Sequence, residues 1–491
     1  MSRPVTRAGL SALLVLGVAA SLAPLRAGAV PSPEPAAPDP GVARAGPAGA
    51  GTSAWGPIGA PDSTNTSTFR AIPPPTWEQV ADFPITAVSY PLKLVMMGAE
   101  ASVETLDESP TWHRIRRFLP LGPAHVFSGG VTLGGGEGYG GNVSVDLRDF
   151  GPAHDAFKLK LGAQSAGDRR ATLALRLRRS ELSWFELGGG YRSDRNARFF
   201  GIGPDAAEDA ESFYRREVSW AGATWHRTVA GDYGVAISAM YSGVAATGTD
   251  LSDDPHLSQE FAGQLPFGYR RESDGRMAGL ELTHENTEKL GPPEHPWRER
   301  ARPEHGGLER ATVSWFEGKG NSRAVYWTWR AEAQQFLPLW HSRRALALRG
   351  FVSRQENRGD DPVPFQRMLT NDDPDVFRGY PDERFHDIGI ASLTAEYRWP
   401  LWVVDNENAL GADAYVFADW GQVFAKLDEL GMERLAKSYG GGVRLGGHGR
   451  FIGRIEVGHS EEGTQFRLRA DQLFQYEKGG FFNARSPVPD R

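Results

Sequence analysis

The sequence has no cysteine among its 491 residues. Disulfide bonds and thiolate metal sites are therefore excluded, because both require cysteine sulfur. A lipid anchor attached to a cysteine near the N-terminus is excluded for the same reason.

Long hydrophobic runs and a basic bias are also missing. Beyond the first 29 residues no run reaches the roughly 18 apolar residues of a transmembrane helix, so none is predicted. The formal net charge of −7 argues against the basic surface that binds nucleic acid. The mean hydropathy of −0.42 is typical of a soluble protein. It leaves a membrane β-barrel open, because barrel strands show only every second residue to lipid.

The N-terminus has the parts of an export signal. Arg3 and Arg7 make it basic, residues 10–23 form an apolar core, and the small residues 27–29 end a predicted cleavage site. The core is shorter than the about 20 residues that span a bilayer. We therefore interpret residues 1–29 as a signal peptide; the alternative is a retained anchor helix.

Two further segments precede the main pattern of the chain. Residues 30–75 are rich in Pro, Ala, Gly and Ser and have no apolar period, which predicts a disordered linker. Residues 76–121 carry apolar side chains at helical spacing: Leu92, Val95, Met96, Ala99 and Val103. We expect a helical segment that lies either on the periplasmic membrane surface or against ordinary protein.

From about residue 126 the apolar period changes from 3.6 residues to 2, and it stays there for roughly 350 residues. Representative stretches are residues 157–161, 173–178, 325–334, 392–399, 413–420, 451–457 and 466–471. A soluble sandwich or propeller also alternates, but its core face is normally aliphatic. Here the apolar face carries aromatics near strand ends and the opposite face is dense in Arg, Glu and Asp, which favours a membrane barrel with a polar lumen.

Segments bounded by turn residues number sixteen, the even count of a closed bacterial barrel. They begin near residues 124, 138, 155, 170, 181, 213, 231, 275, 307, 323, 343, 387, 408, 438, 450 and 463. Long connections at residues 193–212, 245–274 and 356–386 alternate with short turns. The long connection 286–306 breaks this alternation, so either it is an insertion or the count is wrong by one hairpin. We expect an all-β, sixteen-stranded antiparallel transmembrane barrel over residues 122–476, followed by a tail at 477–491.

No recognised catalytic or cofactor motif fits this pattern. The glycines at 136, 138 and 141 match a dinucleotide-binding spacing but lie at a hairpin tip with no helix after them. His284, His295 and His305 lack metal-ligand spacing. The acidic residues 253–254 and 372–375 could take calcium, although a solvated loop explains them better. We therefore expect no enzyme activity, no cofactor and no metal.

A group of motifs near the C-terminal end resembles a known family. Arg378-Gly379-Tyr380, the run at 396–401 (Glu-Tyr-Arg-Trp-Pro-Leu) and Phe417-x-Asp419-x-Gly421 occur in the order found in the bacterial surface antigen barrels of the BamA/TamA superfamily. Supporting matches are residues 196–203 and the Gly-Gly-Gly-Val-Arg run at 440–444. The resemblance covers roughly residues 122–476, and the family's barrel also has sixteen strands.

The resemblance implies a loop that folds into the lumen and is held there by an Arg–Asp pair. Arg378 and Asp419 are the matching residues, and the period of 2 places Asp419 on the lumen face beside Asp413 and Tyr415. Glycine at 379 lets the backbone turn tightly against the wall. The residues expected in this structural latch are Arg378, Gly379, Tyr380, Glu396, Phe417, Asp419, Gly421 and Arg444. The alternative is a flexible external loop with a solvated arginine.

The family's members insert or translocate protein, and they carry periplasmic repeats ahead of the barrel. Residues 76–121 are too few for such repeats, so we expect them to be absent and a separate periplasmic partner or client protein to be involved. Residues 466–474 are expected to act as an internal strand signal for barrel targeting. The resemblance implies an outer-membrane barrel in contact with lipid and lipopolysaccharide and active in membrane assembly or translocation; the alternative is a passive pore or structural barrel.

Overall fold

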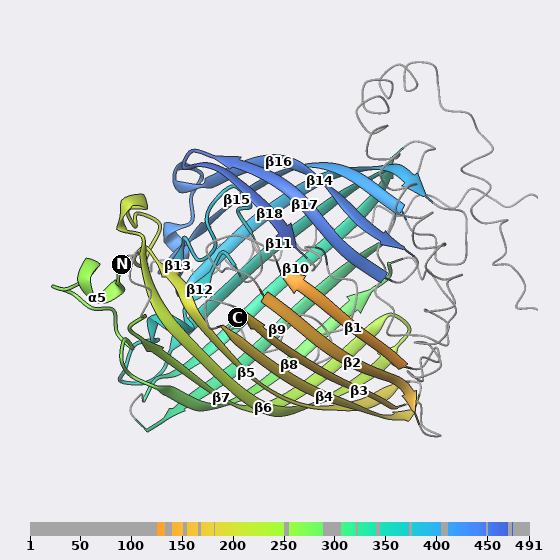
Figure 1. Ribbon diagram of the computed structural model, residues 1–491, viewed down its shortest axis with the longest axis horizontal. Coiled ribbons are helices and arrows are strands. Elements are labelled where there is room, and N and C mark those ends of the chain that lie inside the picture. The colour runs from red at the N-terminus through yellow and green to blue at the C-terminus, as the bar shows by residue number, and fades with distance from the viewer. Residues whose placement is uncertain are drawn as a thin grey trace, which may run out of the picture. The chain divides into compact units, whose positions relative to one another are not determined.

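The computed structural model describes residues 125–132, 140–150, 155–164, 168–180, 182–249, 255–287, 306–320, 323–339, 344–372, 376–403, 411–447, 450–469 and 474. These residues form one antiparallel sheet of sixteen strands, which curls into a barrel (Figure 1). The predicted signal peptide, linker and helical segment (1–29, 30–75 and 76–121) and the tail at 477–491 lie outside the described residues.

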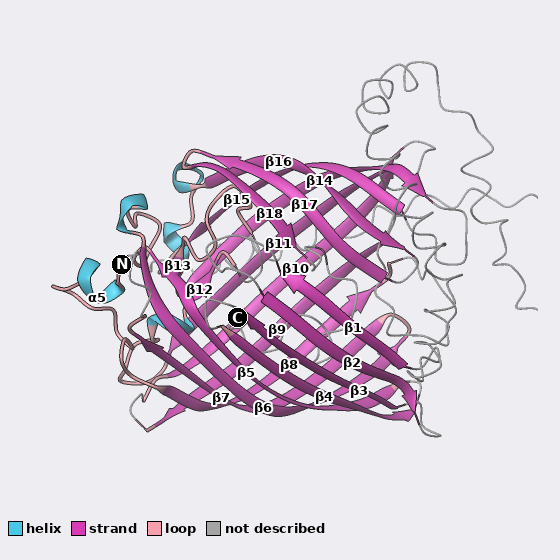
Figure 2. Ribbon diagram, viewed as in Figure 1, coloured by secondary structure: helices cyan, strands magenta, loops and turns pink. Residues whose placement is uncertain are grey.

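The strands follow one another in the sheet in sequence order, and Figure 2 shows how fully they make up the described chain. They are β1 (His125–Thr132), β2 (Gly140–Phe150), β3 (Asp155–Gln164), β4 (Arg169–Ser180), β5 (Ser183–Phe199), β6 (Ser212–Ala230), β7 (Tyr233–Thr247), β8 (Ser273–Glu285), β9 (Gly306–Lys319), β10 (Val325–Leu339), β11 (Arg344–Asn357), β14 (Gly389–Val403), β15 (Gly411–Val423), β16 (Ala436–Gly447), β17 (Arg450–Ser460) and β18 (Gly463–Arg469). The two-residue strands β12 (Leu369–Thr370) and β13 (His386–Asp387) pair with each other in the loop between β11 and β14.

The predicted count of sixteen strands is confirmed. The start that differs most from its expected position is that of β15, at Gly411 against 408. Strands β8 and β9 pair directly, so the connection at 286–306 is an insertion and the count was not wrong by a hairpin. The long loops after β5, β7, β11 and β15 all leave the same end of the barrel, because the strands alternate in direction. We call this the loop end.

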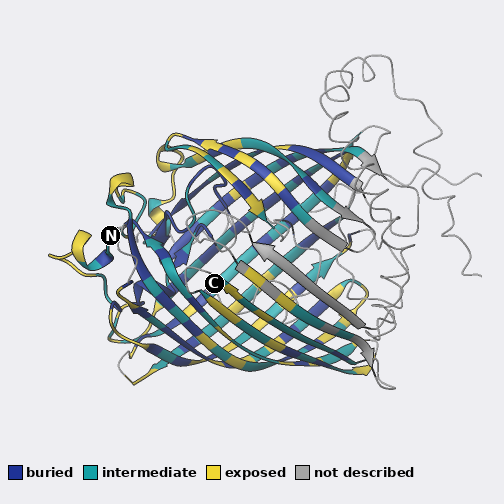
Figure 3. Cartoon of the chain, in the orientation of Figure 1, coloured by how far each residue is buried: buried dark blue, intermediate teal, exposed yellow. Residues whose placement is uncertain are grey.

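Successive residues alternate between the two faces of the sheet along the strands whose side chains the structure describes, as the period of 2 predicts (Figure 3). On β15, Val416 is 48% exposed on the outer face, whereas its neighbours Tyr415 and Phe417 are buried on the inner face. On β18, Phe466 and Leu468 are 70% and 65% exposed. An apolar outer face with a charged inner face is the pattern of a strand between lipid and a polar lumen.

The outermost strands of the sheet are β1 and β18. Within the described residues β1 pairs with β2 alone and β18 with β17 alone. In the same part of the chain, no helix is long and apolar enough to span a membrane. Strand β18 has only seven residues, against nineteen in β6. The C-terminal edge of the sheet is therefore short.

Apolar clusters inside the barrel join side chains of the loops to side chains of the wall. In one cluster, Phe377, Tyr380 and Phe385 of the β11–β14 loop pack with Phe351 and Val423 of the wall. A second cluster joins three loops: Phe199 ends β5, Leu257 begins the short helix α5 (Leu257–Glu260) of the β7–β8 loop, and Phe365 belongs to the β11–β14 loop. The loop end of the barrel therefore has a packed interior, and it is the β11–β14 loop that both clusters share.

Candidate functional site

The candidate site is the β11–β14 loop and the inner wall that it contacts. A series of tight turns shapes the loop: Phe377 and Glu383 adopt positive φ angles of 61° and 58°, and the Tyr380 N–H donates to the Phe377 carbonyl at 2.9 Å. The side chain of Asn371 joins the two arms, because it donates to the Pro381 carbonyl at 2.9 Å and accepts from the Phe385 N–H at 3.1 Å. The loop is thus internally ordered where it meets the wall.

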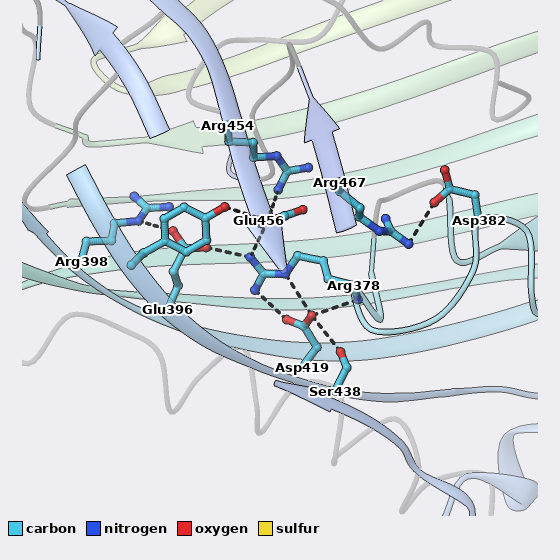
Figure 4. A network of polar contacts seen from close by, with 10 residues as sticks. Arg378, Asp382, Glu396, Arg398, Asp419, Ser438, Arg454, Glu456 and Arg467 are labelled. Carbon is cyan, nitrogen blue, oxygen red and sulfur yellow. Dashed lines mark hydrogen bonds and ion pairs between the residues drawn. The ribbon is translucent and has the colours of Figure 1, made fainter. Parts of the chain in front are cut away.

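Arg378 lies at the centre of the site and is fully buried (Figure 4). Its Nε and Nη2 donate to the two carboxylate oxygens of Asp419 at 3.0 and 2.8 Å, and its backbone N–H donates to the same carboxylate at 3.2 Å. Its Nη1 donates to Glu396 at 3.0 Å and lies 3.6 Å from Glu456. The guanidinium also stacks 3.4 Å from the ring centroid of Phe417. A planar guanidinium suits this two-pronged contact, which a lysine cannot make.

The three carboxylates around Arg378 have further partners. Arg398 donates to Glu396 at 2.6 Å, and Arg454 lies 3.4 Å from Glu456. The network of three arginines and three carboxylates is therefore balanced in formal charge. Hydroxyl groups complete it: Ser438 donates to Asp419 at 3.2 Å and Tyr415 donates to Glu456 at 2.7 Å. A buried network of this kind is stable only when nearly every polar atom has a partner.

Electrostatics fix the charge of the central residue. Burial by itself lowers the pKa of Arg378, but Asp419, Glu456 and Glu396 together raise that pKa well above its ordinary value. The guanidinium is accordingly charged at every pH at which the protein is folded. At the next turn of the loop, burial and the charge of Glu461 raise the pKa of Tyr380 to about 12, so its hydroxyl stays protonated.

Glycines let the loop backbone lie directly on the wall. A Cβ atom at Gly379 would fall 2.7 Å from the backbone of His459 and from Ser438. A Cβ atom at Gly458 of β17 would fall 2.5 Å from the carbonyl oxygen of Arg378. Gly421 leaves room for the ring of Phe377. The close approach therefore depends on glycine from both sides of the contact.

Seven of the eight residues expected in the latch lie where the loop meets the wall, and the eighth is Arg444. The structure brings Arg378, Glu396, Phe417 and Asp419 into direct contact. Arg444 faces the lumen as expected, donates to Asp413 at 3.0 and 3.1 Å, and also interacts electrostatically with Glu396. It thus forms its own pair on the neighbouring part of β15 and β16. The hydroxyl of Tyr380 donates to Glu461 at 3.3 Å.

Several residues of the site were not singled out from the sequence: Glu456, Arg398, Ser438, Gly458 and Arg367. The period of 2 places the first four on the lumen face. It gives no indication that they share a level with Asp419, because that depends on the register of neighbouring strands. Here Glu396 lies opposite Phe417, which lies opposite Gly440, which lies opposite Gly458.

Arg367 is a second buried arginine of the same loop, and it contacts a different part of the wall. Its Nη2 donates to the carbonyl oxygens of Ser273 and Ser242 at 2.5 and 3.0 Å, and its Nε donates to the Ser273 hydroxyl at 2.9 Å. The guanidinium lies 4.3 Å from the ring centroid of Phe316. The loop is therefore anchored at two points: on β7–β9 through Arg367 and on β14, β15 and β17 through Arg378.

Other loops cover this one. The Gly203 N–H donates to the His386 carbonyl at 2.8 Å, Arg384 donates to the Ala206 carbonyl at 2.6 Å, and the Phe365 N–H donates to the Phe267 carbonyl at 2.9 Å. The β5–β6 and β7–β8 loops thus lie over the anchored loop and share hydrogen bonds with it.

Of the three histidines weighed from the sequence, His284 lies within the described residues, and His295 and His305 lie outside them. His284 pairs with Glu309 at 2.7 Å and stacks on Tyr233. Among the residues that the structure describes, no group of three or more His, Cys, Asp or Glu could hold a metal ion. The glycine motif at 136–141 and the acidic residues 253–254 and 373–375 lie wholly or partly outside the described residues.

The targeting signal expected at residues 466–474 divides between two environments. Phe466 faces outward, whereas Phe474 is buried with Phe336 and Ala347 and lies 4.5 Å from the Arg398 guanidinium. Phe474 is thus linked, through Arg398 and Glu396, to the network around Arg378.

The sheet and its polar interior define a β-barrel of the outer-membrane type. The fold is that of the BamA barrel: BamA from Haemophilus ducreyi lacking POTRA domains 1–3 aligns with a TM-score of 0.50 and 12% identity over 70% of this chain and 69% of that chain. CdiB from Acinetobacter baumannii aligns with a TM-score of 0.40 and 15% identity over 71% of this chain and 56% of that chain. No protein-family model and no curated protein matches the sequence. The resemblance inferred from the motifs is therefore confirmed at the level of the fold.

Proposed function

We propose that this protein resides in the bacterial outer membrane and acts in the assembly or translocation of protein or lipid. The β11–β14 loop, latched inside the barrel by Arg378 and Asp419, is the observation that carries the proposal. Two buried arginine anchors and three interlocked loops at one mouth are features that an open passive pore does not require. A barrel that handles a client at its wall requires a lumen that stays shut meanwhile.

The expected substrate passes at the seam between β1 and β18. Two observations favour this place: the described part of β18 pairs only with β17, and its outer face presents Phe466 and Leu468. A weakly paired edge can accept a new strand, because its N–H and C=O groups are available to another chain. A separate periplasmic protein would deliver the client.

Deleting the gene in its host tests this role. We expect the outer membrane of the deletion strain to lose particular proteins or to change in lipid composition. A gene encoding Arg378→Ala, expressed in the deletion strain, should not restore the wild-type protein or lipid composition. An outer membrane of unchanged protein and lipid composition would contradict an assembly role.

Conductance in planar bilayers tests the alternative of a passive pore. We expect the wild-type protein to be closed for most of the recording and Arg378→Ala to open large, fluctuating currents. A steady open conductance that Arg378→Ala leaves unchanged would favour the passive pore.

A further inference from the structure

Strand β18 lies at the edge of the sheet near the latch and, within the described residues, has backbone hydrogen bonds to one neighbouring strand only. It pairs with β17 over seven residues, from Gly463 opposite Ser460 to Arg469 opposite Arg454. Edge strands have one unpaired side, so their position depends strongly on side-chain contacts. The contacts that hold the inner face of β18 therefore matter more than those of a central strand.

The inner face of β18 is held by the β11–β14 loop. Arg467 donates to the carbonyl oxygen of Tyr380 at 2.6 Å and pairs with Asp382 at 2.9 Å (Figure 4). Arg469 pairs with the other oxygen of Asp382 at 2.7 Å and lies 3.6 Å from Asp372. One carboxylate of the loop thus bridges two successive inward-facing arginines of the edge strand.

The same loop segment holds the turn between β17 and β18. Arg384 donates through Nε to both carboxylate oxygens of Glu462 at 2.9 Å, and this pair is almost completely buried. Ser460 donates to the Gly379 carbonyl at 2.8 Å, and Tyr380 reaches Glu461. Residues 379–384 therefore contact the β17–β18 hairpin both at its turn and along the strand β18.

These contacts come from residues that directly follow the Arg378 anchor. Residues 379–384 form tight turns in which the Arg384 N–H donates to the Pro381 carbonyl at 3.3 Å. Arg378 itself holds β14, β15 and β17. Nothing longer than a few turn residues separates the latch from the contacts on β18, so the two move as one body.

We propose that residues 379–384 are a strap that sets the position of the edge strand β18 from inside the barrel. Docking of the loop and immobilisation of β18 are then one conformational event. When the strap leaves the wall, β18 loses the contacts that Arg467 and Arg469 make with residues 380 and 382. Asp382 and Arg384 are positioning residues in this device.

Hydrogen exchange of the full-length protein in lipid bilayers tests the strap. The double variant Asp382→Ala/Arg384→Ala removes the Asp382 contacts to Arg467 and Arg469 and the Arg384 contact to Glu462, and it leaves Arg378 and its carboxylates in place. We expect backbone amides of residues 463–469 to exchange about tenfold faster in this variant, because charge-assisted hydrogen bonds are lost. Amides of β4, whose described residues have no polar or ring contact with Asp382 or Arg384, should be unchanged.

Asp205→Ala is the matched control, since it breaks an exposed ion pair with Arg434 at the same end of the barrel. It should leave exchange in residues 463–469 as in the wild type. Equal exchange of β18 in the double variant and the wild type would overturn the proposal. So would faster exchange in all strands of the double variant, because that would indicate general destabilisation. Neither result bears on the proposed role in assembly, which gene deletion tests separately.

Discussion

The two anchors of the β11–β14 loop are built from the same residue type and differ in their chemistry. Arg378 donates to carboxylates of Asp419 and Glu396, whereas Arg367 donates to hydroxyl and carbonyl oxygens of Ser242 and Ser273. Both guanidinium groups lie over a phenylalanine ring. The serine groups bound by Arg367 tolerate the loss of the arginine better, because each remains an ordinary polar group. Buried carboxylates do not tolerate it, because they keep a charge with a weaker counterion.

The largest effect is expected at the charged anchor. Arg378→Ala should lower the free energy of unfolding by roughly 3–5 kcal/mol, because it leaves Asp419, Glu396 and Glu456 buried with one cation fewer. Urea unfolding in lipid vesicles, followed by heat-modifiable gel mobility, measures the change. Arg378→Lys should recover only part of it, since an ammonium cannot bond both oxygens of Asp419 in one plane. Full recovery by lysine would show that charge alone matters.

The anchor at Arg367 should contribute less. Arg367→Ala should cost about 1–3 kcal/mol, the usual result of leaving buried hydrogen-bonding groups without a partner. The same unfolding assay applies. If Arg367→Ala lowered the free energy of unfolding as much as Arg378→Ala or more, the comparison between the anchors would be wrong. If the double variant Arg367→Ala/Arg378→Ala lost the sum of the two single losses, the anchors would act independently.

The close approach of the Arg378 backbone to the wall should also contribute to the stability of the latch. Gly458→Ala places a methyl group against the Arg378 carbonyl and should cost about 1–3 kcal/mol through overpacking. Gly350→Ala in β11 is the control, because a Cβ atom at that position would meet no other residue's heavy atoms within 4 Å, its two chain neighbours aside. If both variants unfold at the same urea concentration, close backbone approach is unimportant for the latch.

The smallest effect at neutral pH concerns His386, which lies between the anchors and β14 in sequence and contacts Phe199. Burial, followed by the charge of Arg216, lowers the pKa of His386 from 6.5 to about 3. A depressed pKa means that the unfolded chain binds the proton first, so stability is lost as pH falls below 6.5. The loss from this residue should be roughly 1.4 kcal/mol for each pH unit.

The measurement is a difference between the wild type and His386→Gln, taken by urea unfolding from pH 7 to pH 4. Burial raises the pKa of neighbouring Asp387 to about 6, which has the opposite sign and is common to both proteins. The free energy of unfolding of the wild type should therefore fall relative to that of His386→Gln as the pH drops below 6.5. Parallel curves would mean that His386 does not titrate in this range.

The sequence predicted the fold well, because the information for it is local. A period of 2 and the turn residues locate each strand and assign each side chain to a face, which is how Asp419 could be placed in the lumen. The order of the family motifs identified Arg378 as the arginine of the latch. The path of the loop is not a local property: Arg367, Glu456 and Asp382 are ordinary polar residues in the sequence, and their roles follow from the register of strands that lie far apart in the chain. Arg444 shows the same limit, since its face was predicted and its partner was not.

The contact between Gly458 and Arg378 has a consequence for the order in which the barrel is made. Residues 378–382 contact residues 456–469, which are synthesised some eighty positions later. Closing so large a loop costs entropy that is recovered only when both partners are in place. Full docking of the loop therefore requires that residues 456–469 have joined the sheet, because they carry these partners.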